Sequence, residues 1–75
     1  MQKEHTYTIP KITVVLQPQE KIIEMPRPKT VIQLFNKLGI RRGTALVIRN
    51  GELLTPDRSI MADEIITVRI VTSSG

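Results

Sequence analysis

The chain has no cysteine and no tryptophan, and its only aromatic residues are Tyr7 and Phe35. Without cysteine there is no disulfide framework, no thiolate nucleophile and no cysteine-based zinc site. Any hydrophobic core must therefore be mainly aliphatic. The scarcity of aromatic side chains also removes the stacking platforms on which many binders of single-stranded nucleic acid rely. We expect an aliphatic domain for which nucleic acid is a disfavoured partner.

The sequence also lacks a long apolar run. Every stretch of consecutive apolar residues is far shorter than the about 20 residues that a membrane-spanning helix needs. The N-terminal residues contain no apolar segment of the kind found in signal peptides. Together with the absence of cysteine, these features predict a cytoplasmic protein without a membrane partner.

The residues that build active sites are scarce. The single histidine, His5, lies in a polar leader, so no set of nucleophile and general base is expected. One histidine without cysteine does not form a metal site. The four glycines are scattered, which excludes a glycine-rich phosphate loop. We expect that the chain is not an enzyme and binds neither a metal nor a cofactor.

Seventy-five residues with a hydrophobic share of 40% are enough for one small globular domain. Composition divides the chain into a flexible N-terminal extension, a domain and a flexible C-terminal tail, at residues 1–9, 10–71 and 72–75. The net charge of +4 comes from 11 basic and 7 acidic residues. The basic residues are spread along the chain, which favours a solvated surface over a dedicated binding stripe.

Strand signals flank one helix signal. The segment KITVVLQ alternates apolar and polar residues, and KIIEM follows it after a turn at 17–20, so we expect a hairpin. TALVIRNGELL predicts a strand, an Asn50-Gly51 turn and a short strand, because both turn positions of an Asn-Gly hairpin favour positive φ. IITVRIVT predicts the last strand, with Ile66, Val68 and Ile70 on one face.

The segment TVIQLFNKLG predicts a helix over residues 31–38. Thr30 and Gln33 have the spacing of a capping box, and Gly39 is at the usual position after the last turn. The apolar residues follow the spacing of one helical face, at Val31, Leu34, Phe35 and Leu38. A helix of this length is not stable alone and must pack on a sheet.

This order of elements predicts an α+β fold with a mixed sheet of four to five strands and one helix packed across one face. If the first and last strands pair at the centre of the sheet, the arrangement is the β-grasp, or ubiquitin-like, fold. Leu46, Val47 and Ile48 are consecutive apolar residues, so one face of their strand carries apolar side chains away from the helix.

Two interpretations of that outer face remain open. Its β-branched residues can simply favour the strand conformation, or they can form a docking patch for a partner. The candidate partner-binding residues are Leu46, Ile48, Arg69 and Val71.

The segments TVIQLFNKLGI and ALVIRNGELLTPDRSIMADEIITVRIVTSSG resemble the MoaD/ThiS family of ubiquitin-like sulfur carriers, over about residues 11–75. In that family a similar helix is followed by a strand that ends in Asn-Gly, a variable loop, a DGDEI-like turn, a last strand and Gly-Gly. MADEII occupies the place of that turn, with Asp63, Glu64 and Ile65 kept and Ala62 where glycine is usual.

The resemblance implies a mechanism that acts at the terminal carboxylate. Gly75 would be adenylated by an activating enzyme of the ubiquitin type, which uses ATP, and then converted to a thiocarboxylate. Thr72, Ser73 and Ser74 would form the tail that enters the partner. The further partners implied are a sulfur donor such as a cysteine desulfurase and a sulfur-accepting synthase, in thiamin, molybdopterin or thiolated-tRNA biosynthesis.

The chain departs from the family at its end, because the family ends in Gly-Gly and this chain ends in Ser73-Ser74-Gly75. The tail can work as it stands, the chain can belong to a branch with a different partner, or its end can have been altered. The alternative functions are a ubiquitin-like protein modifier and a β-grasp module that binds protein or RNA without terminal chemistry.

Overall fold

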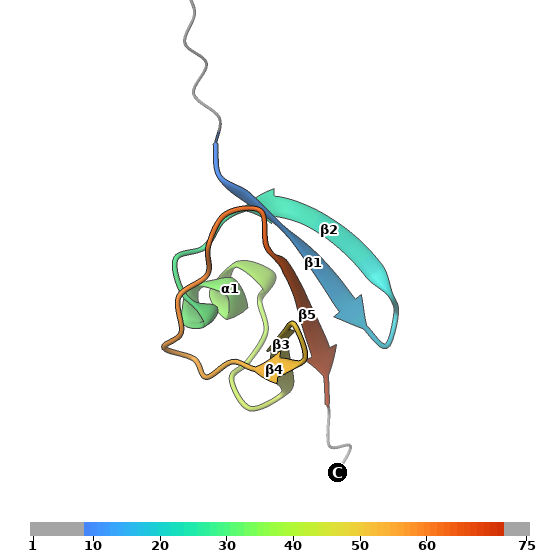
Figure 1. Cartoon of the computed structure of the whole chain (residues 1–75). Coiled ribbons are helices and arrows are strands. Elements are labelled where there is room, and N and C mark those ends of the chain that lie inside the picture. The colour runs from blue at the N-terminus through green and yellow to red at the C-terminus, as the bar shows by residue number, and fades with distance from the viewer. Residues whose placement is uncertain (1–8, 72–75) are drawn as a thin grey trace, which may run out of the picture.

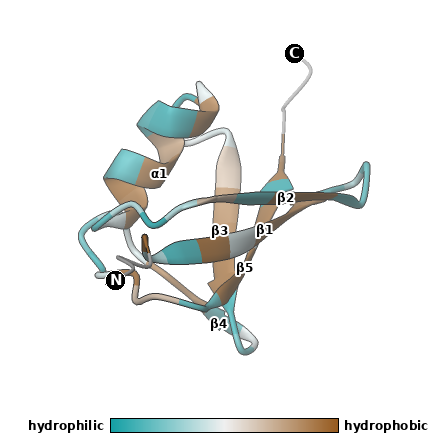
Figure 2. Ribbon diagram, turned by 90° about the horizontal axis from the view of Figure 1, so that it is seen from above, coloured by the Kyte–Doolittle hydropathy of each residue, from teal (hydrophilic) through white to brown (hydrophobic). Residues whose placement is uncertain are grey.

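The structure, a computed structural model, describes residues 9–71 as one sheet with one helix on one of its faces (Figures 1 and 2). This confirms the expected α+β class with a mixed sheet. The elements in chain order are β1 (Lys11–Gln17), β2 (Lys21–Pro26), α1 (Val31–Leu38), β3 (Ala45–Arg49), β4 (Glu52–Leu53) and β5 (Ile65–Ile70). Within the described range, no helix is long and apolar enough to cross a membrane.

The strand order is β2-β1-β5-β3-β4, so the last strand lies at the centre of the sheet. It pairs in parallel with β1, with Val15 opposite Thr67. It pairs in antiparallel fashion with β3, with Val47 opposite Val68. The first and last strands thus pair at the centre of the sheet, and their parallel pairing makes the sheet mixed.

Helix α1 begins and ends at the predicted residues. The Thr30 hydroxyl accepts the backbone N–H of Gln33 at 3.3 Å. The reciprocal bond of a capping box differs from expectation, because the Gln33 side chain accepts the N–H of Lys29 at 2.9 Å. Gly39 has φ 69, and the N–H of Ile40 reaches the carbonyl of Phe35 at 2.9 Å, as in a Schellman cap.

β2 extends one residue beyond the predicted KIIEM segment, to Pro26. The residue pairs with Lys11 at the end of an edge strand. A proline is tolerated there because its missing N–H removes no bond from the interior of the sheet.

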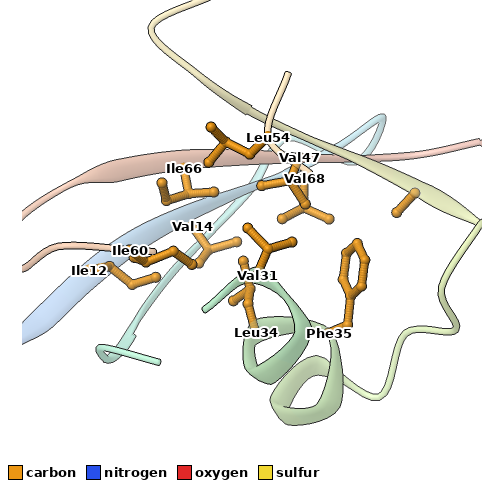
Figure 3. Close-up of a cluster of buried hydrophobic side chains, with 11 residues drawn as sticks. Ile12, Val14, Val31, Leu34, Phe35, Val47, Leu54, Ile60, Ile66 and Val68 are labelled. Atoms are coloured by element: carbon orange, nitrogen blue, oxygen red, sulfur yellow. The ribbon is translucent and has the colours of Figure 1, made fainter. Parts of the chain in front are cut away.

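The core lies between α1 and the inner face of the sheet. Figure 3 shows Val31, Leu34 and Phe35 of α1 among side chains from the strands and the loop after β4. No polar residue in the described range is buried. Removing these apolar side chains from water is the main force that holds the short helix on the sheet. The buried residues are Ile12, Val14, Val31, Leu34, Phe35, Ala45, Val47, Leu54, Ile60, Ile66 and Val68.

Two arginines hold the irregular segment 54–64 against this core. Arg27 donates from Nη1 to the carbonyl of Ile60 at 2.7 Å. Arg49 donates from Nη1 to both carboxylate oxygens of Glu64, at 3.0 and 3.2 Å, and to the carbonyl of Ser59 at 3.3 Å. The segment has little regular structure, so these side chains supply bonds that a sheet or helix would otherwise provide.

The turn before β5 requires positive φ at Asp63, not at Ala62. Asp63 has φ 64, and its N–H reaches the carbonyl of Lys11 at 2.7 Å. Aspartate tolerates this left-handed conformation better than most side chains do. Alanine at position 62 is therefore compatible with the turn.

Candidate functional site

The open face of the sheet, on the side away from α1, carries the predicted partner-binding residues. Side chains alternate along a strand, so Ala45 and Val47 point to the core while Leu46 and Ile48 point outward. On β5, Ile66 and Val68 are buried and Arg69 lies on the outer face.

The strand register brings these residues together. Leu46 is directly opposite Arg69, and Ile48 is directly opposite Thr67. Opposed residues on one face have Cβ atoms only about 4.5–5.5 Å apart, so they form one continuous surface. The structure thus joins three of the four predicted residues, Leu46, Ile48 and Arg69, on neighbouring strands.

A single row of side chains crosses all five strands at this level. The opposed pairs are Val15 with Ile22, Val15 with Thr67, Ile48 with Thr67, and Ile48 with Leu53. We call Ile22, Val15, Thr67, Ile48 and Leu53 the outer row. Four of its five side chains are apolar, and the row lies on the sheet face that no helix covers. It therefore forms an apolar band across a face open to solvent.

Val71 marks the point where the chain leaves the sheet. Its N–H donates to the carbonyl of Thr44 at 2.9 Å, which extends the pairing with β3 one residue beyond β5. Thr44 in turn closes a tight loop, because its hydroxyl donates to the carbonyl of Arg41 at 2.6 Å. Val71 is 40% exposed and stands two residues beyond Arg69, on the same side of the strand. The exit of the chain is thereby fixed next to the outer face.

The predicted tail residues Thr72, Ser73, Ser74 and Gly75 lie outside the described residues, as do residues 1–8. Of the predicted N-terminal extension, only Ile9 is described; it is 62% exposed. The carbonyl of Pro10, the first residue of the predicted domain, accepts the N–H of Arg27 at 2.9 Å.

The charges near the outer face are few. Arg69 lies in it, between Leu46 and Gln17 on the two neighbouring strands. The carboxylate of Glu64 is occupied by Arg49 and by the N–H of Met61 at 3.0 Å. Among residues 9–71 no group of three or more histidine, aspartate and glutamate side chains is placed to hold a metal ion.

Three exposed apolar residues of this surface were not among the sequence candidates. Ile22 is 70% exposed, Leu53 is 58% exposed and Ile65 is 65% exposed. Ile22 and Leu53 belong to the outer row through their pairing with Val15 and Ile48. The pairing of Ile22 and Leu53 with these residues could have been predicted from the two hairpin turns, because the length of a hairpin loop fixes which residues of its two strands are opposite each other.

No family model matches the chain, and no curated protein matches it. The function must therefore be argued from the geometry of the site.

Proposed function

We propose that this chain is a β-grasp, ubiquitin-like carrier that is activated at the carboxylate of Gly75 and delivers sulfur to a biosynthetic acceptor. The observation that carries the proposal is the position of the last strand. β5 is central in the sheet, bonded on both sides, and leads directly from the outer face to the terminal residues.

The element order supports the β-grasp assignment. A hairpin is followed by a helix over one sheet face, and the last strand inserts between β1 and β3. Figure 1 shows β5 running beside β1, with α1 on one side of the sheet. In this arrangement β5 contributes to the open sheet face and is also the last element before the terminal residues.

That relationship suits delivery of a carboxylate to a partner. A protein that grips Leu46, Ile48 and Arg69 also fixes the direction in which the chain leaves at Val71. The four residues beyond Val71 span at most about 14 Å when fully extended. A nucleotide site within that distance of the docking surface would receive the carboxylate at high effective concentration.

The proposed chemistry requires two steps, both performed by partners. The Gly75 carboxylate attacks the α-phosphorus of ATP, which releases pyrophosphate and forms an acyl adenylate. A persulfide or sulfide from a sulfur donor then replaces AMP, and the product is a terminal thiocarboxylate. A persulfide donor also needs a thiol reductant to release its second sulfur atom. A synthase finally takes up that sulfur, in the formation of a cofactor or a thiolated tRNA.

Small residues at the end of the chain fit a narrow partner site. Ser74 adds a Cβ and a hydroxyl where glycine would leave room, while Gly75 keeps the last position free of a side chain. We expect Ser74→Gly to keep activity or raise it, since the change removes only bulk.

The test uses the full chain with an adenylating enzyme that activates a control carrier, together with ATP and a sulfide source. Intact mass spectrometry should show the gain expected for exchange of one oxygen atom for sulfur. Deleting Ser74 and Gly75 should abolish that gain. If the wild-type chain forms neither adenylate nor thiocarboxylate, while the control carrier does, the proposal is wrong.

A matched pair of surface variants separates docking from folding. Ile48→Lys places a charge in the outer row and should lower the rate of activation by about tenfold or more, as expected for a central interface residue. Met61→Lys changes another exposed apolar residue, in the loop before β5, and should leave the rate unchanged. Equal effects of the two variants would argue against docking through the outer row.

The open apolar face also supports a second candidate, an interaction module without terminal chemistry. Such a module would keep its partner after deletion of Ser74 and Gly75, whereas a carrier or a protein modifier would lose its function. A modifier differs from a sulfur carrier in its product, because Gly75 would then form an amide bond with a lysine of another protein.

A further inference from the structure

The edge of β3 that faces away from β5 is only partly covered. β4 has two residues, which pair with Ile48 and Arg49, and the N–H of Leu54 then reaches the carbonyl of Val47 at 2.8 Å. The bond from Val71 to Thr44 shows that alternate residues of β3 turn their backbone groups toward β5. Ala45 and Val47 therefore turn theirs toward the β4 side.

Beyond Val47 this edge has no partner strand within the described residues. No hydrogen bond joins the N–H or the carbonyl of Ala45 to any residue on that side, and the N–H of Val47 is likewise without one there. An edge strand with unpaired backbone groups is a template for another extended chain. The exposed part of β3 thus offers three unpaired backbone groups, the N–H and carbonyl of Ala45 and the N–H of Val47.

A groove of about 670 Å³ runs alongside this edge. Its floor is made by Val31 and Phe35 of α1 together with Ala45, Val47 and Leu54, all of them buried apolar residues. In Figure 3 the side chain of Phe35 points from α1 toward the strands, where Val47 is labelled. An apolar side chain of a bound segment would contact these buried residues, whose positions are already fixed by packing in the core.

Among the described residues, the groove has one charged side chain, Arg42, which lies at the end where β3 begins, and no carboxylate lines it. The groove is therefore cationic at one end and apolar along the rest of its length. A segment that combines a bulky apolar residue with an acidic one is complementary to it.

We propose that the free edge of β3 binds an extended peptide segment of a partner protein by strand addition. The segment runs antiparallel to β3, in line with β4. A bulky apolar residue lies opposite Ala45 with its side chain over Phe35 and Leu54, and acidic residues two to three positions later reach Arg42. The groove touches the outer face at Leu46 and Leu53, but the binding groups are the backbone of β3 and the apolar floor on the α1 side, so the site does not depend on the proposed carrier function.

The spacing follows from strand geometry. Opposed residues of a sheet share a face, and Ala45 points to the core, so the residue opposite it also points inward, over the groove. An antiparallel segment runs toward the start of β3, where the chain turns at residues 41–44 and Arg42 lines the end of the groove. An acidic residue is thereby placed next to the guanidinium.

The test is a titration of the ¹⁵N-labelled full chain with the synthetic peptide acetyl-TVFVDE-amide, followed by amide NMR. We expect saturable shifts at Ala45, Val47 and Leu54, and slower hydrogen exchange of the Ala45 and Val47 amides in the complex. A peptide N-methylated at its phenylalanine should bind much more weakly, because it cannot donate to the carbonyl of Ala45.

Two charge-reversal variants form the matched control. Arg42→Glu should weaken binding of this peptide by roughly 3- to 10-fold, as expected for a partly exposed charge pair. Lys21→Glu makes the same change of charge on β2, at the other edge of the sheet, and should leave the affinity unchanged. The acidic peptide should also bind more tightly than acetyl-TVFVKK-amide.

Four results would overturn the proposal. They are no saturable shift, shifts centred on Ile48 and Thr67 rather than Ala45, equal binding of the N-methylated peptide, and equal weakening by Arg42→Glu and Lys21→Glu. Shifts of Ala45 and Val47 that grow with protein concentration before any peptide is added would also contradict it, because the edge would then be occupied by a second copy of the chain.

Discussion

Arg49 and Glu64 form a half-buried ion pair across 15 residues of sequence, with Nη1 at 3.0 Å from Oε1 and 3.2 Å from Oε2. Their side chains are only 16% and 23% exposed. The pair joins β3 to the turn that starts β5, and Glu64 also accepts the N–H of Met61. It therefore connects the loop after β4 to the sheet at the place where the central strand begins.

We expect Glu64→Gln to lower the free energy of unfolding by about 1–3 kcal/mol, since the half-buried Arg49 would lose its anionic partner. Urea denaturation followed by circular dichroism measures this change. The control is Glu24→Gln, which removes an exposed pair with Lys11 at 3.9 Å and should cost less than about 0.5 kcal/mol. Similar losses in both variants would show that burial of the Arg49–Glu64 pair does not increase its contribution to the free energy of unfolding.

In the turn before β5, we expect glycine substitutions at two adjacent positions to change the free energy of unfolding in opposite directions. Asp63→Gly should raise the free energy of unfolding by about 0.5–1 kcal/mol, because Asp63 has φ 64 and glycine adopts this conformation without steric cost. Ala62→Gly should lower it by about 0.5 kcal/mol, because Ala62 is not among the residues with positive φ and glycine only adds freedom to the unfolded chain. Chemical denaturation of both variants measures the two changes, and stabilisation by Ala62→Gly would contradict the prediction.

The lowered pKa of Asp57 predicts that the free energy of unfolding depends on pH. The hydroxyl of Thr55, which donates to its carboxylate at 2.6 Å, holds the pKa of Asp57 below its usual value, and the backbone N–H of Asp57 and the charge of Arg58 add to the effect. A depressed pKa in the folded state contributes stability that is present above the pKa of the unfolded state. That contribution is lost as the pH falls through the folded-state pKa.

We expect Thr55→Val to raise the pKa of Asp57 toward its usual value and to reduce the acid-dependent loss of stability. An NMR titration of the Asp57 carboxyl carbon measures the pKa directly, and denaturation at several acidic pH values measures the stability. Asp57→Asn serves as the reference that lacks the titrating group. An unchanged pKa in Thr55→Val would show that the hydroxyl bond is not its main cause.

We expect alanine substitutions at the two residues that cap the first turn of α1 to lower the free energy of unfolding by unequal amounts. Thr30→Ala should lower the free energy of unfolding by about 1 kcal/mol, because the Gln33 N–H would lose the Thr30 oxygen that accepts it. Gln33→Ala should cost less, since its exposed side chain contacts the N–H of Lys29, which lies outside the helix. Thermal denaturation compares the variants, and a larger loss for Gln33→Ala would contradict this order.

Much of the local structure could be predicted from the sequence. The bounds of α1, its N-cap at Thr30, the Asn50-Gly51 turn and the alternation of β1 and β5 agree with the structure because each depends on residues within a few positions of one another. The outward direction of Leu46 and Ile48 could also be predicted from alternation. The bond from Gln33 to Lys29 could not, since it depends on the path of the chain before the helix.

The amino-acid sequence by itself determined the class of elements, their order and the absence of cysteine chemistry, because propensity, capping and periodicity act over short distances. Only the tertiary structure decided that β5 lies between β1 and β3, that five side chains from five strands share the outer row, and that the edge of β3 at Ala45 is left open beside an apolar groove. Those features depend on the register between strands that are distant in sequence. That register is selected by burying one face of β1, β3 and β5 against α1 at the same time.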